Sequence, residues 1–116
     1  MGSRFMDNKK GDPYYIQKVI TDLEFIVQHT KGISQSQLEE NEVLVDSVMF
    51  RLIQVSENAD KLTDGFKARF TAIPWRAIKG LRNRIVHEYG NVDLSIVYDT
   101  VSKDIPELLR ELKDVI

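Results

Sequence analysis

The sequence predicts an all-α protein, an antiparallel bundle of four or five helices. Apolar residues recur at helical spacing, and no segment shows the alternation of a strand or an internal repeat. The length of 116 residues suits one domain, which we expect over residues 12–116. Residues 1–11 are polar and aperiodic, so we expect them to be disordered. Their Met-Gly-Ser start, followed by Met6, resembles the remnant of an expression tag.

The first helix is expected to begin at Asp12-Pro13, with the aspartate as N-cap and the proline at the first helical position. Lys31-Gly32 supplies a cationic last turn and a C-terminal glycine, so the helix ends near Thr30. The residues between them place one apolar face on the helix: Ile16, Val19, Ile20, Leu23, Ile26 and Val27.

A long second helix is expected to begin at or just beyond the capping box Ser36-Gln37-Leu38-Glu39. A second apolar strip lies off its main face, so this helix is predicted to be buried on more than one side. Another helix of the chain or a second subunit could cover the strip. The main stripe is Val45, Val48, Met49, Leu52, Val55, Ala59 and Leu62, and the second strip is Val43, Phe50 and Ile53.

The long helix is expected to end at the Asp-Gly pair of residues 64–65. A short helix or loop then leads to the Ile-Pro pair at 73–74, because a residue before proline disfavours the helical conformation. A third helix is predicted from Trp75 to about Tyr89. The Gly-Asn pair at 90–91 would stop it.

A fourth helix is expected to start at Asp93, whose carboxylate can cap it. Pro106 either kinks this helix or opens a last one. The apolar residues of this C-terminal part are Leu94, Ile96, Val97, Val101, Leu108, Leu109 and Leu112.

Composition excludes several classes of chemistry. The chain has no cysteine, which removes disulfides, thiolate nucleophiles and cysteine-ligated metals. Its two histidines, His29 and His87, cannot form a three-histidine metal site, so we expect neither a metal nor a cofactor. No apolar run reaches the ~18 residues of a membrane span, and no secretory signal opens the chain. We therefore expect a cytoplasmic protein.

Charge is distributed unevenly although the net charge is only −2. Residues 65–87 hold six basic side chains and no carboxylate, whereas both flanking segments are acidic. Such a segment can hold a polyanion, with Lys67, Arg69, Arg76 and Lys79 as candidate RNA-binding residues. The charge alone favours a simpler interpretation, a solvated helix surface paired with acidic neighbours.

The densest group of reactive side chains is Arg82-Asn83-Arg84-Ile85-Val86-His87-Glu88-Tyr89. On a helix, Asn83 and His87 share a face, so the amide could fix the imidazole tautomer. Arg82 and His87 are about 140° apart round the axis. They meet at one phosphate only if the arginine wraps round, the helix loosens, or a two-fold partner supplies one of them. Without further knowledge the group could equally be an ordinary helix end.

Other residues receive structural interpretations. Arg84 and Glu88 are predicted to form a surface ion pair worth about 0.3–0.5 kcal/mol. His29 suits the dipole at the end of the first helix. Trp75 could stack on a base, but a core position is favoured. Gly80 is expected to mark a close approach between helices.

The segment 82–89 matches the Arg-x4-His-x-Tyr motif of HepT-like toxins, a branch of the HEPN superfamily of small helical bacterial and archaeal proteins. Residues 73–75, 80–84 and 92–97 also resemble that family. The run Val-Ser-Glu-Asn-Ala at 55–59 departs from an expected Ile-Gly-Glu-Ala-like run, and we expect the loss of that glycine to alter helix packing.

The resemblance implies a metal-independent endoribonuclease, the toxin of a toxin–antitoxin pair, acting as a homodimer with both motifs at a shared cleft. It implies His87 as general base or acid and Arg82 as the cation that stabilises charge on phosphorus. Asn83 would orient the imidazole or bind phosphate. The second proton donor would be the other subunit's His87 or Tyr89. The expected product carries a 2′,3′-cyclic phosphate, and DNA is not cleaved.

The resemblance also implies a regulator. A partner nucleotidyltransferase of the MntA type would transfer AMP to the motif tyrosine, here Tyr89, and the added charge would block the cleft. One rival hypothesis is a non-catalytic helical subunit that binds nucleotide or substrate for such an enzyme. Another is a dimerising bundle with a relic motif. The intact Arg82 and His87 pair favours the enzyme.

Overall fold

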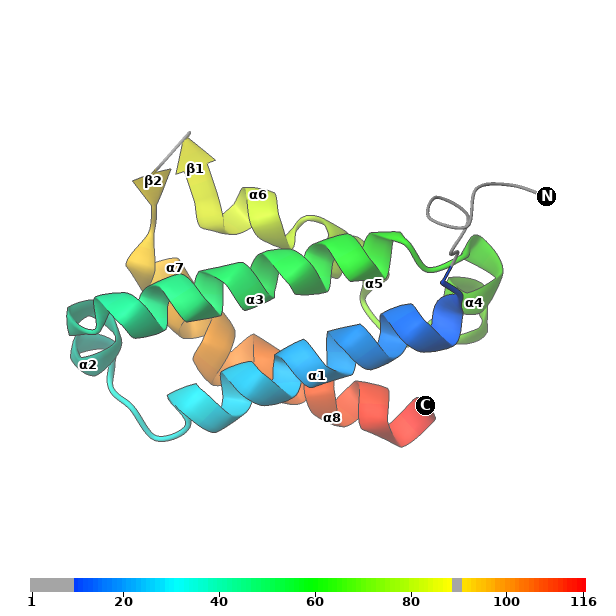
Figure 1. Cartoon of the computed structure of the whole chain (residues 1–116), viewed down its shortest axis with the longest axis horizontal. Helices are drawn as coiled ribbons and strands as arrows, with labels where there is room; N and C mark the ends of the chain where they lie inside the picture. Colours follow the sequence, from blue (N-terminus) through cyan, green and yellow to red (C-terminus); the bar gives the residue numbers. More distant parts are fainter. Residues whose placement is uncertain (1–9, 89–90) are drawn as a thin grey trace.

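A computed structural model describes residues 10–88 and 91–116, and it confirms the all-α bundle (Figure 1). Four helical rods run alternately in opposite directions along the molecule. None of the helices in the described residues is long and apolar enough to cross a membrane. The rods are α1 (Asp12–Thr30), α3 (Glu42–Asp60), α5 (Trp75–Lys79) with α6 (Leu81–Ile85), and α7 (Leu94–Asp99) with the π-helical turn η1 (Thr100–Asp104) and α8 (Ile105–Val115). Two short helices, α2 (Gln35–Glu40) and α4 (Asp64–Arg69), and a pair of strands, β1 (Val86–Glu88) and β2 (Asn91–Val92), complete the fold.

The long helices α1 and α3 pack against each other along their lengths, and the other two rods pack on this pair. α5 and α6 pack on α3, whereas α8 and η1 pack on α1. The predicted apolar stripes meet in one core between the rods. Its fully buried side chains include Leu23, Ile26, Val48, Leu52, Val55, Val97, Val101 and Leu112.

The start of α1 differs from the expectation. Gly11 is the N-cap and Asp12 is the first helical residue, so the prediction that Asp12 caps its own helix was wrong. Its carboxylate accepts hydrogen bonds from the backbone N–H of Thr63 at 2.8 Å and from the Thr63 hydroxyl at 2.7 Å. These bonds lower the pKa of Asp12. Asp12 therefore ties the start of α1 to the turn between α3 and α4. At the other end, Gly32 has φ +76°, in accordance with the predicted C-terminal glycine.

The capping box lies two residues earlier than predicted. Ser34 accepts from the Gln37 amide at 3.1 Å, and the Gln37 side chain accepts from the Ser34 amide at 2.8 Å. This box starts the short α2 rather than the long helix. The long helix α3 begins after Asn41, which accepts from the Leu44 amide at 3.0 Å.

The third helix ends at Ile85, four residues before the predicted Tyr89. Residues 86–88 are extended and pair antiparallel with β2, with Val86 opposite Val92. Consecutive β-branched side chains at 85–86 favour this change to extended backbone. The predictions that Asn83 aligns with His87 and Arg84 with Glu88 on one helix were therefore wrong, because the helix ends between the two residues of each pair.

The last rod combines the two alternatives for Pro106. Asp93 caps α7 as predicted, accepting from the amides of Ser95 and Ile96. The chain then continues through the π turn η1 directly into α8, in which Pro106 lies in the first turn. In this wider turn the Ile105 N–H donates a hydrogen bond to the Thr100 carbonyl, five residues back. Pro106 follows in the first turn of α8, where a helix tolerates a residue without an N–H donor.

Candidate active site

A hollow of about 350 Å³ lies between α3 and the α5–α6 rod. It brings together three of the residues singled out from the sequence, Arg82, Asn83 and Lys79. All three are exposed, and they come from the last turn of α5 and from α6. The opposite wall consists of Ser56, Glu57 and Asp60 from the C-terminal half of α3 and of Lys61, which caps that helix.

Two ion pairs cross this hollow. An Nη of Arg82 lies 3.9 Å from a carboxylate oxygen of Glu57, and the Lys79 ammonium lies 3.7 Å from Asp60. All four side chains are more than half exposed, and exposed pairs of this kind are worth about 0–1 kcal/mol. The prediction of cations paired with acidic neighbours is thus confirmed here. Because the pairs are weak, a phosphate can replace either carboxylate as the partner of these cations.

The run at 55–59, which differs from the one expected from the resemblance, contributes hydrogen bonds at this surface. The Ser56 hydroxyl donates a hydrogen bond of 3.1 Å to the Lys79 carbonyl at the end of α5. The amide of Asn58 donates to the Gln54 carbonyl one turn back at 2.8 Å. Ser56 therefore joins α3 to the helix that precedes Arg82.

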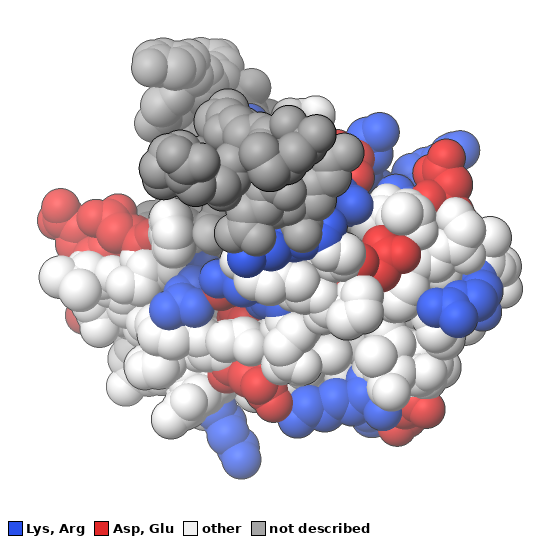
Figure 2. Space-filling model, turned by 45° about the vertical axis from the view of Figure 1, so that its right-hand side comes forward, with Lys and Arg blue, Asp and Glu red and all other residues white. Residues whose placement is uncertain are grey.

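The remaining basic residues of the segment 65–87 divide between several places. Lys67 and Arg76 line a smaller hollow of about 180 Å³ that shares Lys79 with the first. Arg69 lies over the rings of Phe66 and Phe70, with its guanidinium carbon 5.3 Å from each ring centroid. On the face drawn in Figure 2, Lys and Arg side chains form several groups interspersed with Asp and Glu. Lys67, Arg76, Lys79 and Arg82 thus line adjoining hollows, and Arg69 does not.

Arg84 lies outside this site. It contacts Asp104 of η1 at 3.5 Å. The predicted partner Glu88 follows the end of α6, and its side chain lies outside the described residues.

Trp75 has a structural role. Its indole N–H donates to the carbonyls of Lys67 and Phe70 at 3.1 and 3.0 Å, and its ring packs edge-on against Phe66. The half-buried ring belongs to the core, as the sequence favoured. The expectation for Gly80 was wrong, because a Cβ there would meet only the Arg76 and Ala77 carbonyls, at 3.6 Å or more.

Only the backbone of His87 is described, and Tyr89 lies outside the described residues. His87 is the middle residue of β1, which follows α6 directly and projects with β2 beyond the end of the rod (Figure 1). In the described part of the chain, no three His, Asp or Glu side chains lie together as metal ligands would.

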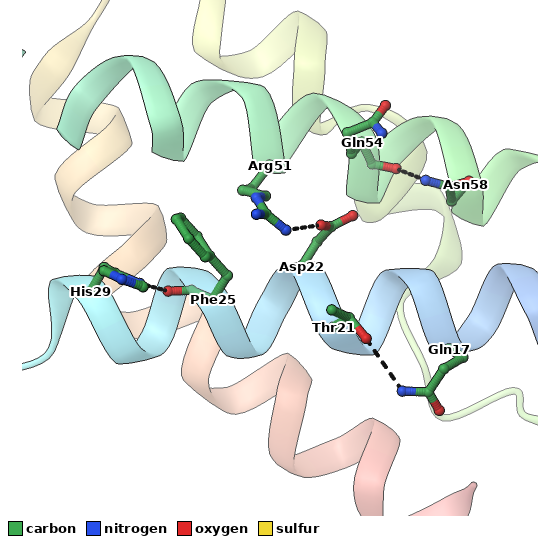
Figure 3. Close-up of polar contacts among 8 residues, drawn as sticks. All are labelled: Gln17, Thr21, Asp22, Phe25, His29, Arg51, Gln54 and Asn58. Atoms are coloured by element: carbon green, nitrogen blue, oxygen red, sulfur yellow. Dashed lines mark hydrogen bonds and ion pairs between the residues drawn. The ribbon is translucent and has the colours of Figure 1, made fainter. Parts of the chain in front are cut away.

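A charged pair that sequence reasoning missed lies on the opposite side of α3 (Figure 3). Arg51 donates to Asp22 of α1 at 2.7 Å, and its guanidinium carbon lies 4.0 Å from the centroid of the Phe25 ring. Asp22 is 1% exposed, and its second carboxylate oxygen has no hydrogen-bond partner among the described residues. An aspartate on the apolar face of the first helix was the available signal.

His29, at the end of α1, stacks on Phe25 at 4.1 Å, and its Nδ1 lies 2.8 Å from the Phe25 carbonyl oxygen. This contact is local to the last turn of α1. It agrees with the structural interpretation of this residue.

Comparison with known proteins assigns the chain to a family. Residues 19–115 match the family described as "Ribonuclease HepT-like". The chain belongs to this HepT-like family. A protein of Caldanaerobacter subterraneus subsp. tengcongensis named "Putative RNase" is 29% identical over 102 residues, 88% of this chain and 91% of the relative. The "Probable ribonuclease HepT" of Thermococcus cleftensis is 26% identical over 100 residues, 86% of this chain and 91% of the relative. No solved structure gave a significant match.

Family membership agrees with the resemblance drawn from the motif and with the helical fold. The structure adds Glu57, which the sequence analysis named only as part of the run 55–59. Its position seven residues after Phe50 places it on the exposed side of α3, where it reaches Arg82. A carboxylate opposite the motif arginine is a contact between distant segments, and helical periodicity alone does not reveal it.

Proposed function

We propose that this HepT-like protein is a metal-independent endoribonuclease and the toxin of a toxin–antitoxin pair. The observation that carries the proposal is the hollow in which Arg82, Asn83 and Lys79 lie together. The helix α6, which carries Arg82 and Asn83, leads directly into β1, the strand that holds His87. The family and the names of the two relatives support RNA as the substrate.

The chemistry uses a nucleophile that RNA itself carries. The 2′-oxygen attacks the adjacent phosphorus, the O2′–P bond forms, and the P–O5′ bond breaks. His87 takes the proton of the 2′-hydroxyl as the general base. Arg82 holds the extra negative charge on the phosphoryl oxygens through its planar fork of donors. The products are a 2′,3′-cyclic phosphate and a free 5′-hydroxyl.

The leaving 5′-oxygen needs a proton from a second group. His87 of the partner subunit or Tyr89 would supply it in a homodimer whose motifs share one cleft. An exposed apolar strip on α3 supports such a dimer, because Val43 is 76% exposed and Phe50 is 59% exposed. Glu57 lies two turns beyond Phe50 on α3, so the Arg82 hollow lies at one end of this strip.

The proposal includes control by an MntA-type nucleotidyltransferase that transfers AMP to Tyr89. The added phosphate would pair with Arg82 and occupy the cleft. A Tyr89→Phe protein that its partner still neutralises in full would remove the modification as the means of control.

The test is incubation of the purified protein with total RNA in EDTA, with His87→Ala in parallel. Cleavage that survives EDTA, disappears in the variant and leaves cyclic phosphate ends is the expected result. The control is Glu39→Gln, which removes a charge on α2 far from the hollow. This variant should cleave RNA as the wild type does.

Intact RNA with the folded, unmodified wild-type dimer would overturn the enzymatic proposal. The non-catalytic subunit that binds nucleotide for a nucleotidyltransferase would then be the function to test. Cleavage of DNA that depends on magnesium would contradict the mechanism.

A further inference from the structure

A second groove lies on the other side of α6, between the α5–α6 rod and the η1–α8 part of the last rod. Its volume of about 370 Å³ falls in the range of roughly 300–1,000 Å³ that ligand pockets occupy. Small exposed side chains, Ala72, Pro74 and Ala77, form one wall. The floor is apolar and consists of Ile78, Leu81, Ile105 and Leu108.

The rim of this groove carries acidic side chains. Glu107 and Glu111 lie one turn apart on α8, and neither has an ion-pair partner within 4 Å in residues 10–88 and 91–116. At the other end, Arg84 and Asp104 form their exposed pair at 3.5 Å. An apolar floor beside unpaired carboxylates is complementary to a surface with apolar and cationic side chains.

The wall also holds a polar atom without a partner. Thr100 is fully buried, and its hydroxyl oxygen has no hydrogen-bond partner among the described residues. The same residue begins the π turn η1, and single π turns within helices are frequent at functional sites. The irregular, incompletely satisfied turn and the groove therefore coincide.

We propose that this groove is the docking site for a basic amphipathic helix of a partner protein. Such a helix presents apolar side chains at i, i+3, i+4 and i+7, which fit a groove with an apolar floor. Its lysine or arginine side chains would pair with Glu107 and Glu111 on the rim. The same carboxylates repel phosphate groups, so the groove does not suit RNA or an anionic membrane.

The groove borders the helix that carries the candidate catalytic arginine. Leu81 and Arg84 of α6 line the groove, whereas Arg82 and Asn83 line the hollow on the opposite side. Because α6 has only five residues, a helix seated on Leu81 touches the same turn that positions Arg82. Docking is therefore expected to alter RNA cleavage. This consequence rests on the proposed function, whereas the docking itself does not.

The experiment titrates the ¹⁵N-labelled full chain with a synthetic amphipathic peptide of about 14 residues built from leucine and lysine at helical spacing. Saturable shifts of the amides of Ala77, Leu81, Thr100 and Glu107 are the expected result. A peptide with glutamate in place of lysine should leave these amides unchanged.

Variants of the full chain show whether the groove itself binds. Glu107→Gln with Glu111→Gln should weaken peptide binding at least about tenfold at roughly 0.15 M salt. Glu39→Gln with Glu40→Gln makes the same charge change on α2 and should leave the affinity within about twofold. Ala77→Arg, on an exposed helical position, should weaken binding by a similar factor through repulsion and loss of space.

Several outcomes would overturn the proposal. They are no binding by the wild-type protein, equal losses in the two double variants, or shifts confined to α3. Groove shifts caused by a short RNA, or by raising the protein concentration without peptide, would also overturn it by identifying RNA or a second copy as the occupant. A peptide that binds as predicted to a protein that never cleaves RNA would leave the docking site standing and the ribonuclease refuted.

Discussion

The two sides of α3 carry charged pairs of opposite character. Towards α1, Arg51 and Asp22 meet at 2.7 Å, and the carboxylate side chain is 2% exposed. Towards α6, Glu57 and Arg82 are 3.9 Å apart, and both side chains are more than half exposed. The buried pair keeps a fixed geometry and contributes to the architecture. The exposed pair is weak and leaves its arginine available to an anionic ligand.

The largest expected effect comes from breaking the buried pair. Arg51→Met leaves the Asp22 carboxylate buried without its cation, and removal of one partner of a buried pair typically costs about 3–5 kcal/mol. The free energy of unfolding from urea denaturation measures the loss. Asp22→Asn with Arg51→Met should recover part of it, because the buried charge is then gone. A loss below about 1 kcal/mol in the single variant would place Arg51 with the exposed pairs.

The same kind of change at Arg82 should affect function and not folding. Arg82→Ala is expected to lower RNA cleavage about 10²–10³-fold, since it removes the donor that we propose stabilises charge on phosphorus. Its free energy of unfolding should stay within about 0.5 kcal/mol of the wild type. Single-turnover cleavage and urea denaturation together measure both. Full activity in this variant would remove Arg82 from the mechanism.

Glu57 should have a smaller effect. We expect Glu57→Gln to lower KM about two- to threefold with little change in kcat, because the carboxylate competes with an RNA phosphate for the Arg82 guanidinium. Asp60→Asn removes the neighbouring carboxylate at Lys79 and is the matched control. Equal changes in the two variants would show a general effect of charge on the hollow rather than competition at Arg82.

Ser56 tests whether the hollow depends on its contact with α5. Ser56→Gly introduces the glycine expected from the family resemblance and removes the bond to the Lys79 carbonyl. We expect a loss of about 1–2 kcal/mol, from that hydrogen bond and from glycine within a helix. Ser56→Ala separates the two causes, since it removes only the bond. Equal stability of Ser56→Gly and wild type would show that the bond to α5 contributes nothing.

Much of the bundle could be predicted because helical periodicity depends on local spacing. The apolar stripe of α1 and the Asp93 cap followed directly from the sequence. The end of the third helix did not, because extended pairing of residues 86–88 with β2 outweighs a helical continuation. Asp12 was misassigned for a similar reason, since its hydrogen-bond partner, Thr63, is 51 residues away.

For the candidate site, the sequence supplied the residues of one wall of the hollow but not those of the other wall. Arg82 and Asn83 were proposed because they are adjacent in the segment that resembles the family motif. Their neighbours Glu57 and Asp60 come from a different helix, so only the packing of α3 against α5 and α6 brings them together. The Arg84 contact with Asp104 likewise depends on how two distant rods pack.

The two charged pairs on α3 differ both in distance and in burial. Asp12 separates these two variables, because its hydrogen bonds to Thr63 are about as short as the Arg51–Asp22 contact but lie at the surface. The hydrogen bonds from Thr63 lower its pKa, so the folded protein holds the ionised form more strongly than the unfolded chain. The stabilisation is complete above the unfolded pKa of about 3.9 and is lost as pH falls through the lower folded value.

Asp12→Asn, which mimics the protonated side chain, should therefore lower Tm slightly at neutral pH. The difference from wild type should shrink below about pH 4. Thermal unfolding of both proteins across this range measures it. A Tm difference that is the same at acidic and neutral pH would show that Asp12 stabilises the turn through its shape rather than its charge. The charge of a surface residue with short hydrogen bonds would then contribute as little to stability as the exposed pairs on α3 do, and less than the buried pair.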